Sequence, residues 1–347
     1  MATAMTSRHE VVQALDRVGV DVHGVEISAD GARVAVRATP AQAQDLPRAR
    51  VKLAIREAIK DALPAVGDVV VSLGPPARAP EPPAPSAPAA LAGVRNVICV
   101  GSGKGGVGKS TMTANLAAAL ARDGHRVGVI DADVYGYSIP RMLGVDAEPP
   151  ASDSERIAPL RSPQGIAVMS IGFFLPARNR AIVWRGPMLH KALRQFVADV
   201  SWDELDFLLV DLPPGTGDVS MTLAGLLPDA RFVLVTTPQP AAQTVAARAA
   251  DLAAQFGLEV LGVLENMAAF TPPHGGPEIA MFGSGGGEQL AAELGVPLLA
   301  SVPLDEALRA SADEGRPLVL RDEAGPAASA IVAAARALAV AHHADAR

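Results

Sequence analysis

The stretch Arg95–Ser110, RNVICVGSGKGGVGKS, sets the expected architecture of the chain, because an apolar run leads directly into a glycine-rich loop with two lysines. Gly103–Ser110 fits the pattern G-x-x-x-x-G-K-[ST], and residues 110–124 read as a helix. A strand, a glycine-rich turn and a helix in this order form a phosphate-binding loop, since glycines let backbone N–H groups surround phosphate oxygens at the positive end of the helix dipole. The stretch predicts a nucleoside triphosphate site.

The end of the loop carries the two side chains with chemical roles. Lys109 is expected to contact the terminal phosphates, and Ser110 is expected to ligate Mg²⁺. The same letters also satisfy the dinucleotide pattern G-x-G-x-x-G at Gly101, Gly103 and Gly106. That alternative gives the lysine and the serine no role, so we favour the triphosphate. The expected nucleotide-binding residues of the loop are Gly103, Lys104, Gly105, Gly106, Val107, Gly108, Lys109, Ser110 and Thr111.

Lys104, at the start of the loop, is a second lysine that binding one nucleotide does not need. Like charges repel unless a strongly negative ligand lies between them. An additional cation at the phosphates stabilises the charge that develops during phosphoryl transfer, as an arginine finger does. We therefore expect Lys104 to act in catalysis, and a partner subunit can be its source.

Carboxylates follow two further predicted strands. Asp131 and Asp133 end the run RVGVIDAD, and one of them is expected to bind Mg²⁺ through water while the other orients the attacking water. Asp211 ends the run DFLLVD and is expected to be the second carboxylate near the metal. Asp218, seven residues later, is equally well explained as a turn or helix cap. Carboxyl ends of parallel strands are where such sheets bind ligands.

The chain beyond the loop alternates apolar runs with helical segments. Continuous Val, Ile and Leu runs separated by helices are typical of a parallel sheet that is covered on both faces. The fold class is therefore expected to be α/β, with a doubly wound, mostly parallel sheet. The predicted strands lie in the runs 96–101, 126–133, 166–172, 206–214, 231–239, 259–267 and 297–303.

A proline- and alanine-rich segment divides the 347 residues into two domains. It lacks a periodic apolar face and is typical of an extended tether. Before it, apolar residues at helical spacing alternate with strand-like runs, which indicates a small α/β module. The expected organisation is a small domain at 1–74, a linker at 75–92 and a phosphate-loop ATPase domain at 93–347.

Composition narrows the class of protein. A net charge of −7 argues against a surface that coats nucleic acid. The single cysteine, Cys99, excludes an intramolecular disulfide and suits a reducing compartment. Neither a membrane-spanning apolar run nor the hydrophobic core of a signal peptide is found. We therefore expect a cytoplasmic protein that binds neither membranes nor nucleic acid.

Several motifs, in order along 94–321, resemble one family. They are GKGGVGKS, DADVYGYSIPRMLG, WRGPM, DFLLVDLPPGTGD, VTTPQ, LENM, FGSGGG and VPLDEALR. Together they resemble the Mrp/ApbC group of iron–sulfur cluster carrier ATPases, within the deviant phosphate-loop class that includes MinD and ParA. The small first domain resembles the MIP18-like domain that many members carry ahead of the ATPase.

The resemblance implies a homodimer with ATP at the subunit interface and iron–sulfur apoproteins or assembly factors as partners. By resemblance, Lys104 reaches the phosphates of the partner subunit. Asp133 corresponds to the water-orienting residue of switch I, and Asp211 occupies the Walker B position. Asn266, in LENM, matches a position that contacts adenine.

The sequence departs from the family pattern after LENM. Family members typically carry a C-x-x-C pair there, whose thiolates hold a four-iron cluster between two subunits, whereas this chain has Thr271 and His274. Neither residue supplies a thiolate, and no iron–sulfur ligand is identified. Two functional classes therefore remain: a slow dimeric ATPase that binds or helps transfer iron–sulfur clusters, and a nucleotide-gated scaffold or regulatory ATPase that has lost cluster binding.

Overall fold

The structure is a computed structural model that describes residues 7–15, 18, 20–28, 33–40, 48–73, 91–134, 136–145, 156–174, 186–272, 276–321 and 325–345. The chain divides into two compact units, Met1–Pro83 and Ala84–Arg347. Of the expected linker, residues 75–90 lie outside the described part of the chain.

The first unit is a small α/β module with its own core. Strand β1 pairs antiparallel with β2, which pairs parallel with β3. Leu15, Ile55 and Ile59 from the two helices are fully buried together with Val34 of the sheet. These apolar positions recur at helical and strand spacing, so the pattern that predicts the elements also builds the core. The elements are α1 (Arg8–Leu15), β1 (Val20–Ile27), β2 (Arg33–Pro40), α2 (Arg48–Ala62) and β3 (Asp68–Leu73).

The second unit is built on an eight-stranded sheet with the order β11-β10-β9-β4-β8-β5-β7-β6. All neighbouring strands are parallel except the short edge strand β6, which the sequence did not predict. Each of the seven predicted runs overlaps one strand, so the doubly wound, mostly parallel α/β sheet is confirmed. The strands are β4 (Val97–Ser102), β5 (Val127–Asp131), β6 (Leu160–Arg161), β7 (Ala167–Ser170), β8 (Phe207–Asp211), β9 (Arg231–Thr236), β10 (Glu259–Phe270) and β11 (Leu298–Leu304).

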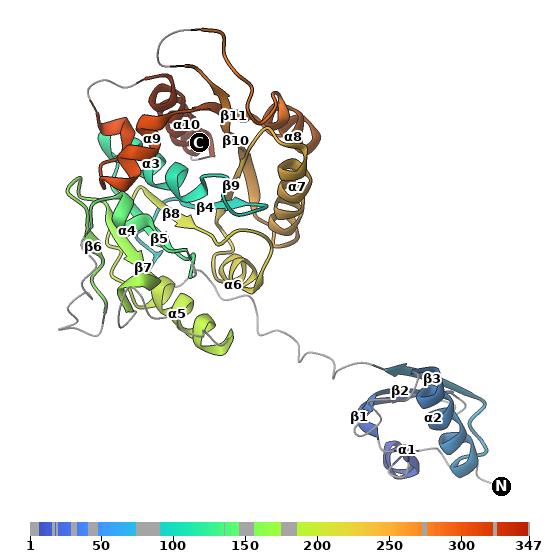
Figure 1. Ribbon diagram of the computed structural model, residues 1–347. Helices are drawn as coiled ribbons and strands as arrows, with labels where there is room; N and C mark the ends of the chain where they lie inside the picture. The colour runs from blue at the N-terminus through green and yellow to red at the C-terminus, as the bar shows by residue number, and fades with distance from the viewer. Residues whose placement is uncertain are drawn as a thin grey trace. The chain divides into compact units, whose positions relative to one another are not determined.

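Helices cover both faces of this sheet (Figure 1). Helices α3 and α10 pack on one face, and α7 and α8 pack against β9 and β10 on the other. Every residue of β5 and β8 is buried. Within the described residues, no helix combines the length and apolar character that crossing a bilayer requires. The helices are α3 (Lys109–Arg122), α4 (Ile139–Met142), α5 (Gly186–Ala198), α6 (Asp218–Leu226), α7 (Pro240–Gln255), α8 (Gly286–Leu294), α9 (Glu306–Asp313) and α10 (Pro326–Asp345).

The strand register brings the predicted carboxylates to one edge. Val100 of β4 is paired with Asp211 of β8, and Asp131 of β5 is paired with the same Asp211. Three neighbouring parallel strands therefore end side by side where the glycine-rich loop begins. This carboxyl edge of the sheet is where open α/β folds bind ligands.

Candidate functional site

The glycine-rich loop forms the floor of a cavity of about 210 Å³. Gly106 and Gly108 have φ angles of 80° and 86°, in the left-handed region that favours glycine. A Cβ atom at Gly108 would also lie 2.2 Å from Asn266 Nδ2, whereas one at Gly106 would meet nothing within 4 Å. The loop therefore requires glycine at 108 for both conformation and space. An open, side-chain-free cradle of this kind fits phosphate groups.

Lys109 lies in a buried polar cluster beside the loop. Its Nζ is 2.7 Å from Asp211 Oδ1, and the two side chains are 6% and 0% exposed. Ser110 Oγ donates to Asp211 Oδ2 at 2.6 Å. A hydroxyl and a carboxylate at this place are oxygen ligands of the type that Mg²⁺ prefers. The structure thus brings Asp211 together with Lys109 and Ser110, which the sequence predicted from two separate motifs.

Thr113 belongs to this cluster, although the sequence analysis missed it. Its Oγ1 lies 2.9 Å from Asp211 Oδ1 and 3.0 Å from the carbonyl oxygen of Lys109. Helical spacing could have identified it, because Thr113 is four residues after Lys109 and lies on the same face of α3. Thr113 therefore helps to hold the carboxylate that pairs with the lysine.

Asp131 is fully buried and holds the segment that follows its strand. Its carboxylate accepts from the backbone N–H groups of Asp133, Ser138 and Ile139 and from Ser170 Oγ. Burial and the nearby Asp211 carboxylate raise the pKa of Asp131 to about 7, while backbone donors and Lys109 act in the opposite direction. The contacts are those of a residue that positions the loop carrying Asp133.

The raised pKa gives a prediction for pH. The folded protein keeps the Asp131 proton up to about pH 7, whereas the unfolded chain loses it near the ordinary aspartate pKa of 3.8. The contribution of Asp131 to the free energy of unfolding is therefore largest below the lower value and is lost as pH rises to the higher one. Urea unfolding from about pH 4.5 to about pH 8 should show a flatter pH dependence in Asp131→Asn than in the wild type. Identical slopes would contradict this assignment.

Asp133 is the strand-end carboxylate that faces the cavity. It is half-buried, and its Oδ1 accepts from the backbone N–H of Gly136 at 3.0 Å. Among the described residues that line the cavity, Asp133 is present and Asp131 and Asp211 are not. Asp133 is therefore the carboxylate best placed to contact a solvent molecule at the loop. Asp218, which the sequence explained equally well as a turn or helix-cap residue, is the first residue of α6.

Lys104 lines the same cavity from the opposite end of the loop. Its Nζ donates to Gln239 Oε1 at 2.7 Å, and its carbonyl oxygen accepts from Ser102 Oγ at 3.1 Å. Gln239 follows β9 and precedes α7. The sequence contains Gln239 in the motif VTTPQ, but no pattern in the sequence assigned it a partner 135 residues away.

Asn266 contacts the loop through a backbone oxygen. Its Nδ2 donates to the carbonyl oxygen of Val107 at 2.9 Å, and the side chain is buried. The next residue, Met267, has a φ of 59°, in the left-handed region that a non-glycine residue rarely adopts. Asn266 therefore supports the phosphate-binding loop from β10, and the adenine contact that the resemblance implies for this residue stays a prediction.

The position where the family pattern has cysteines is only partly described. Thr271 is exposed at the end of β10, and His274 lies outside the described residues. Among the residues described, no group of three or more His, Cys, Asp or Glu side chains could hold a metal ion. Cys99 is buried in β4, and loss of solvation raises the pKa of its thiol to about 12. Its sulfur is therefore not available as a thiolate.

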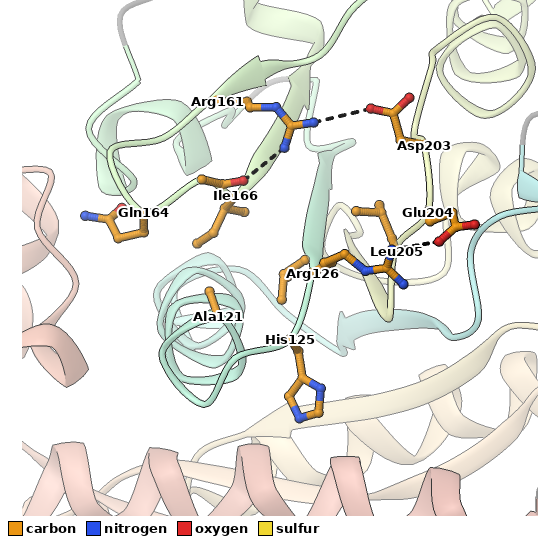
Figure 2. A pocket seen from close by; sticks show the side chains of 11 residues that line it. Ala121, His125, Arg126, Arg161, Gln164, Ile166, Asp203, Glu204 and Leu205 are labelled. Carbon is orange, nitrogen blue, oxygen red and sulfur yellow. Dashed lines mark hydrogen bonds and ion pairs between the residues drawn. The ribbon is translucent and has the colours of Figure 1, made fainter.

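A larger pocket, of about 530 Å³, lies at the other edge of the sheet, near the amino ends of β5 and β8. Figure 2 shows Arg126 and Arg161 at this pocket, each directed toward a carboxylate. Arg126 pairs with Glu204 at 2.8 Å and Arg161 pairs with Asp203 at 3.3 Å. Because its charges are paired within the chain and none of the predicted site residues line it, we assign the nucleotide site to the smaller cavity.

Comparisons with known proteins show the family of this chain. Residues 93–339 match the ParA family model, described as NUBPL iron-transfer P-loop NTPase. An iron–sulfur cluster carrier protein of Deinococcus radiodurans is 44% identical over 320 residues, which are 92% of this chain and 87% of that protein.

Two solved structures place the fold in the same class. A nucleotide-binding protein of Archaeoglobus fulgidus, in complex with ADP, is 38% identical, with a TM-score of 0.60 over 69% of this chain and 92% of that one. The cell division ATPase MinD of Pyrococcus furiosus is 26% identical, with a TM-score of 0.54 over 71% of this chain and 99% of that one. The resemblance to iron–sulfur carrier ATPases of the MinD/ParA class is confirmed, and the chain belongs to the ParA family of NUBPL-type iron-transfer P-loop NTPases.

Proposed function

We propose that this protein is a dimeric, slow ATPase of the cytoplasm that binds or helps transfer iron–sulfur clusters to apoproteins. The observation that carries the ATPase part is the cluster of Lys109, Ser110 and Asp211 beside a glycine cradle. The role as a carrier is supported by the D. radiodurans relative, which is named an iron–sulfur cluster carrier protein. Nucleotide binding is supported by the A. fulgidus protein, whose structure is a complex with ADP.

The side chains divide the work at the cavity. Lys109 binds the terminal phosphates, since it is the cation at the end of the loop. Ser110, which lines the cavity, and Asp211, directly or through water, would hold Mg²⁺, which would supply charge neutralisation at the phosphates. Asp133, the carboxylate that lines the cavity, orients the attacking water. The backbone N–H groups of the loop complete the phosphate site.

Lys104 acts on the phosphates of a partner subunit in this proposal. Hydrolysis is then slow in the separate subunit because the charge-stabilising cation is supplied from outside, as an arginine finger is. This division of the site between two subunits makes ATP binding and dimer formation depend on each other.

The division can be tested by mixing variants. Lys104→Ala should bind ATP but lose hydrolysis and ATP-dependent dimer formation, and Asp133→Ala should lose hydrolysis. In a mixed dimer one site keeps both its own Asp133 and the other subunit's Lys104. After subunit exchange the mixture should recover up to roughly a quarter of the wild-type rate, since half of the dimers are mixed and each has one intact site. A mixture as inactive as its parents, with exchange demonstrated, would refute the action of Lys104 on the partner subunit.

A second candidate is a nucleotide-gated scaffold that has lost cluster binding. The observation that favours it is the lack of cysteine ligands for a cluster. Thr271 occupies the first cysteine position of the family C-x-x-C pair, and the single cysteine of the sequence is buried in β4. Such a protein would act in cluster assembly through a partner and would keep the ATP-dependent switch. The two candidates differ in whether this protein itself takes part in cluster transfer to an apoprotein or acts only through a partner.

A further inference from the structure

The contact between Lys104 and Gln239 lies outside the roles assigned above. Gln239 is the N-cap residue of α7, but its side chain makes no cap hydrogen bond. Its Oε1 instead accepts from Lys104 Nζ at 2.7 Å. The side chains that usually bond the free N–H groups at this position are the short ones of Ser, Thr, Asp and Asn, and the longer Gln239 side chain makes no such bond. The side chain is thus used for the lysine instead of the helix.

Backbone packing fixes the distance between the loop and α7. A Cβ atom at Gly103 would lie 2.3 Å from the backbone nitrogen of Ala246, so loop and helix touch without an intervening side chain. Gln243 Nε2 donates to the carbonyl oxygen of Pro238 at 2.8 Å and holds the segment before the helix. The backbone segments that carry Lys104 and Gln239 are both fixed by these contacts, and this brings the two side chains together.

Two opposing effects act on the lysine at this place. A hydrogen bond from an ammonium group is stronger than one between neutral groups. The ammonium, however, lies at the N-terminus of the sixteen-residue helix α7, where the helix dipole is positive and disfavours a cation. The contact holds Lys104 less firmly than the hydrogen bond alone would, so a phosphate group can compete for the lysine.

We infer that Gln239 is a positioning residue that holds Lys104 within its own subunit and releases it when the lysine engages the phosphates of a partner. The inference rests on the proposed function, in which Lys104 acts on the other subunit. Gln239 contacts neither ATP nor the reacting atoms in this assignment. Breaking the hydrogen bond between Gln239 and Lys104 costs free energy, and this cost reduces the net free energy of dimer formation.

The test uses two variants with opposite expected effects. Gln239→Met keeps the length of the side chain and removes the acceptor, whereas Gln239→Glu replaces the amide with a carboxylate that pairs with the lysine. With a non-hydrolysable ATP analogue, the protomer concentration at half-dimerisation should fall about tenfold in Gln239→Met and rise in Gln239→Glu. In the nucleotide-free full-length protein, reductive methylation of Lys104, measured against exposed Lys191, should be faster in the first variant and slower in the second.

The matched control is Gln255→Met, the same substitution at an exposed position of α7, which should leave both measurements unchanged. Shifts in the same direction in both Gln239 variants, or no shift in Gln239→Met, would overturn the inference. Lys104→Ala separates it from the proposed function. If that variant dimerises with the analogue as the wild type does, the action of Lys104 on the partner fails, while the methylation rates still report whether Gln239 holds the lysine.

Discussion

Lys109→Ala is expected to lose ATP binding and ATP hydrolysis together. The substitution removes the cation at the end of the phosphate-binding loop, and a charge-assisted contact of this kind is worth about 100-fold or more in affinity. It also leaves Asp211, which is 0% exposed, without its partner at 2.7 Å. Breaking a buried ion pair from one side lowers the free energy of unfolding by roughly 3 to 5 kcal/mol. Calorimetric titration with MgATP, phosphate release and urea unfolding measure the three effects.

A second substitution separates binding from stability. Adding Asp211→Asn to Lys109→Ala removes the uncompensated charge, so part of the lost stability should return while ATP binding stays absent. Lys191→Ala, at an exposed position of α5, is the control for removing a lysine and should behave as the wild type. Unchanged ATP affinity in Lys109→Ala, with the protein folded, would contradict the assignment of the site.

The parts of the site that the sequence predicted are those set by spacing along the chain. The loop pattern places Lys109 and Ser110 at the first turn of a helix, and the apolar runs place Asp131 and Asp211 at strand ends. Parallel strands share one carboxyl edge, so these residues had to come close once the sheet was recognised. Spacing and strand direction were enough to predict that the proposed Mg²⁺ ligands lie close together.

The parts that the sequence did not predict depend on contacts between distant segments. Asn266 donates to Val107 across 159 residues, and Lys104 donates to Gln239 across 135. Neither contact follows from a periodic pattern, because each depends on the order of strands in the sheet, which places β9 next to β4 and β10 next to β9. Residue spacing alone also left open which of Asp131 and Asp133 orients the attacking water, a role that the family resemblance implies for Asp133. The structure distinguishes them by burial, since the segment that follows β5 folds over Asp131 and leaves Asp133 at the cavity.

The purified protein is expected not to hold a stable four-iron cluster between two subunits. Such a cluster needs cysteine thiolates, and imidazole replaces them only in part. The sequence has a single cysteine, and burial in β4 raises the pKa of the Cys99 thiol to about 12, which keeps it protonated. Thr271 offers an exposed hydroxyl at the first family position. Neither subunit therefore supplies a thiolate ligand. Without a bridging cluster, dimer formation is expected to depend on ATP, Lys104 and packing between the subunits.

Anaerobic reconstitution with iron and sulfide tests this directly. The wild-type protein should show neither the visible thiolate-to-iron absorbance nor stoichiometric iron after desalting with a chelator, and its ATPase rate should be the same before and after reconstitution. The double variant Thr271→Cys/His274→Cys restores the family pair and should gain a cluster, which shows that the dimer geometry is competent and that only the ligands are missing. A chelator-resistant cluster in the wild type that disappears in His274→Ala would contradict the prediction and would identify the imidazole as a ligand. In that case the protein carries its cluster on fewer thiolates than its relatives, and the scaffold alternative fails.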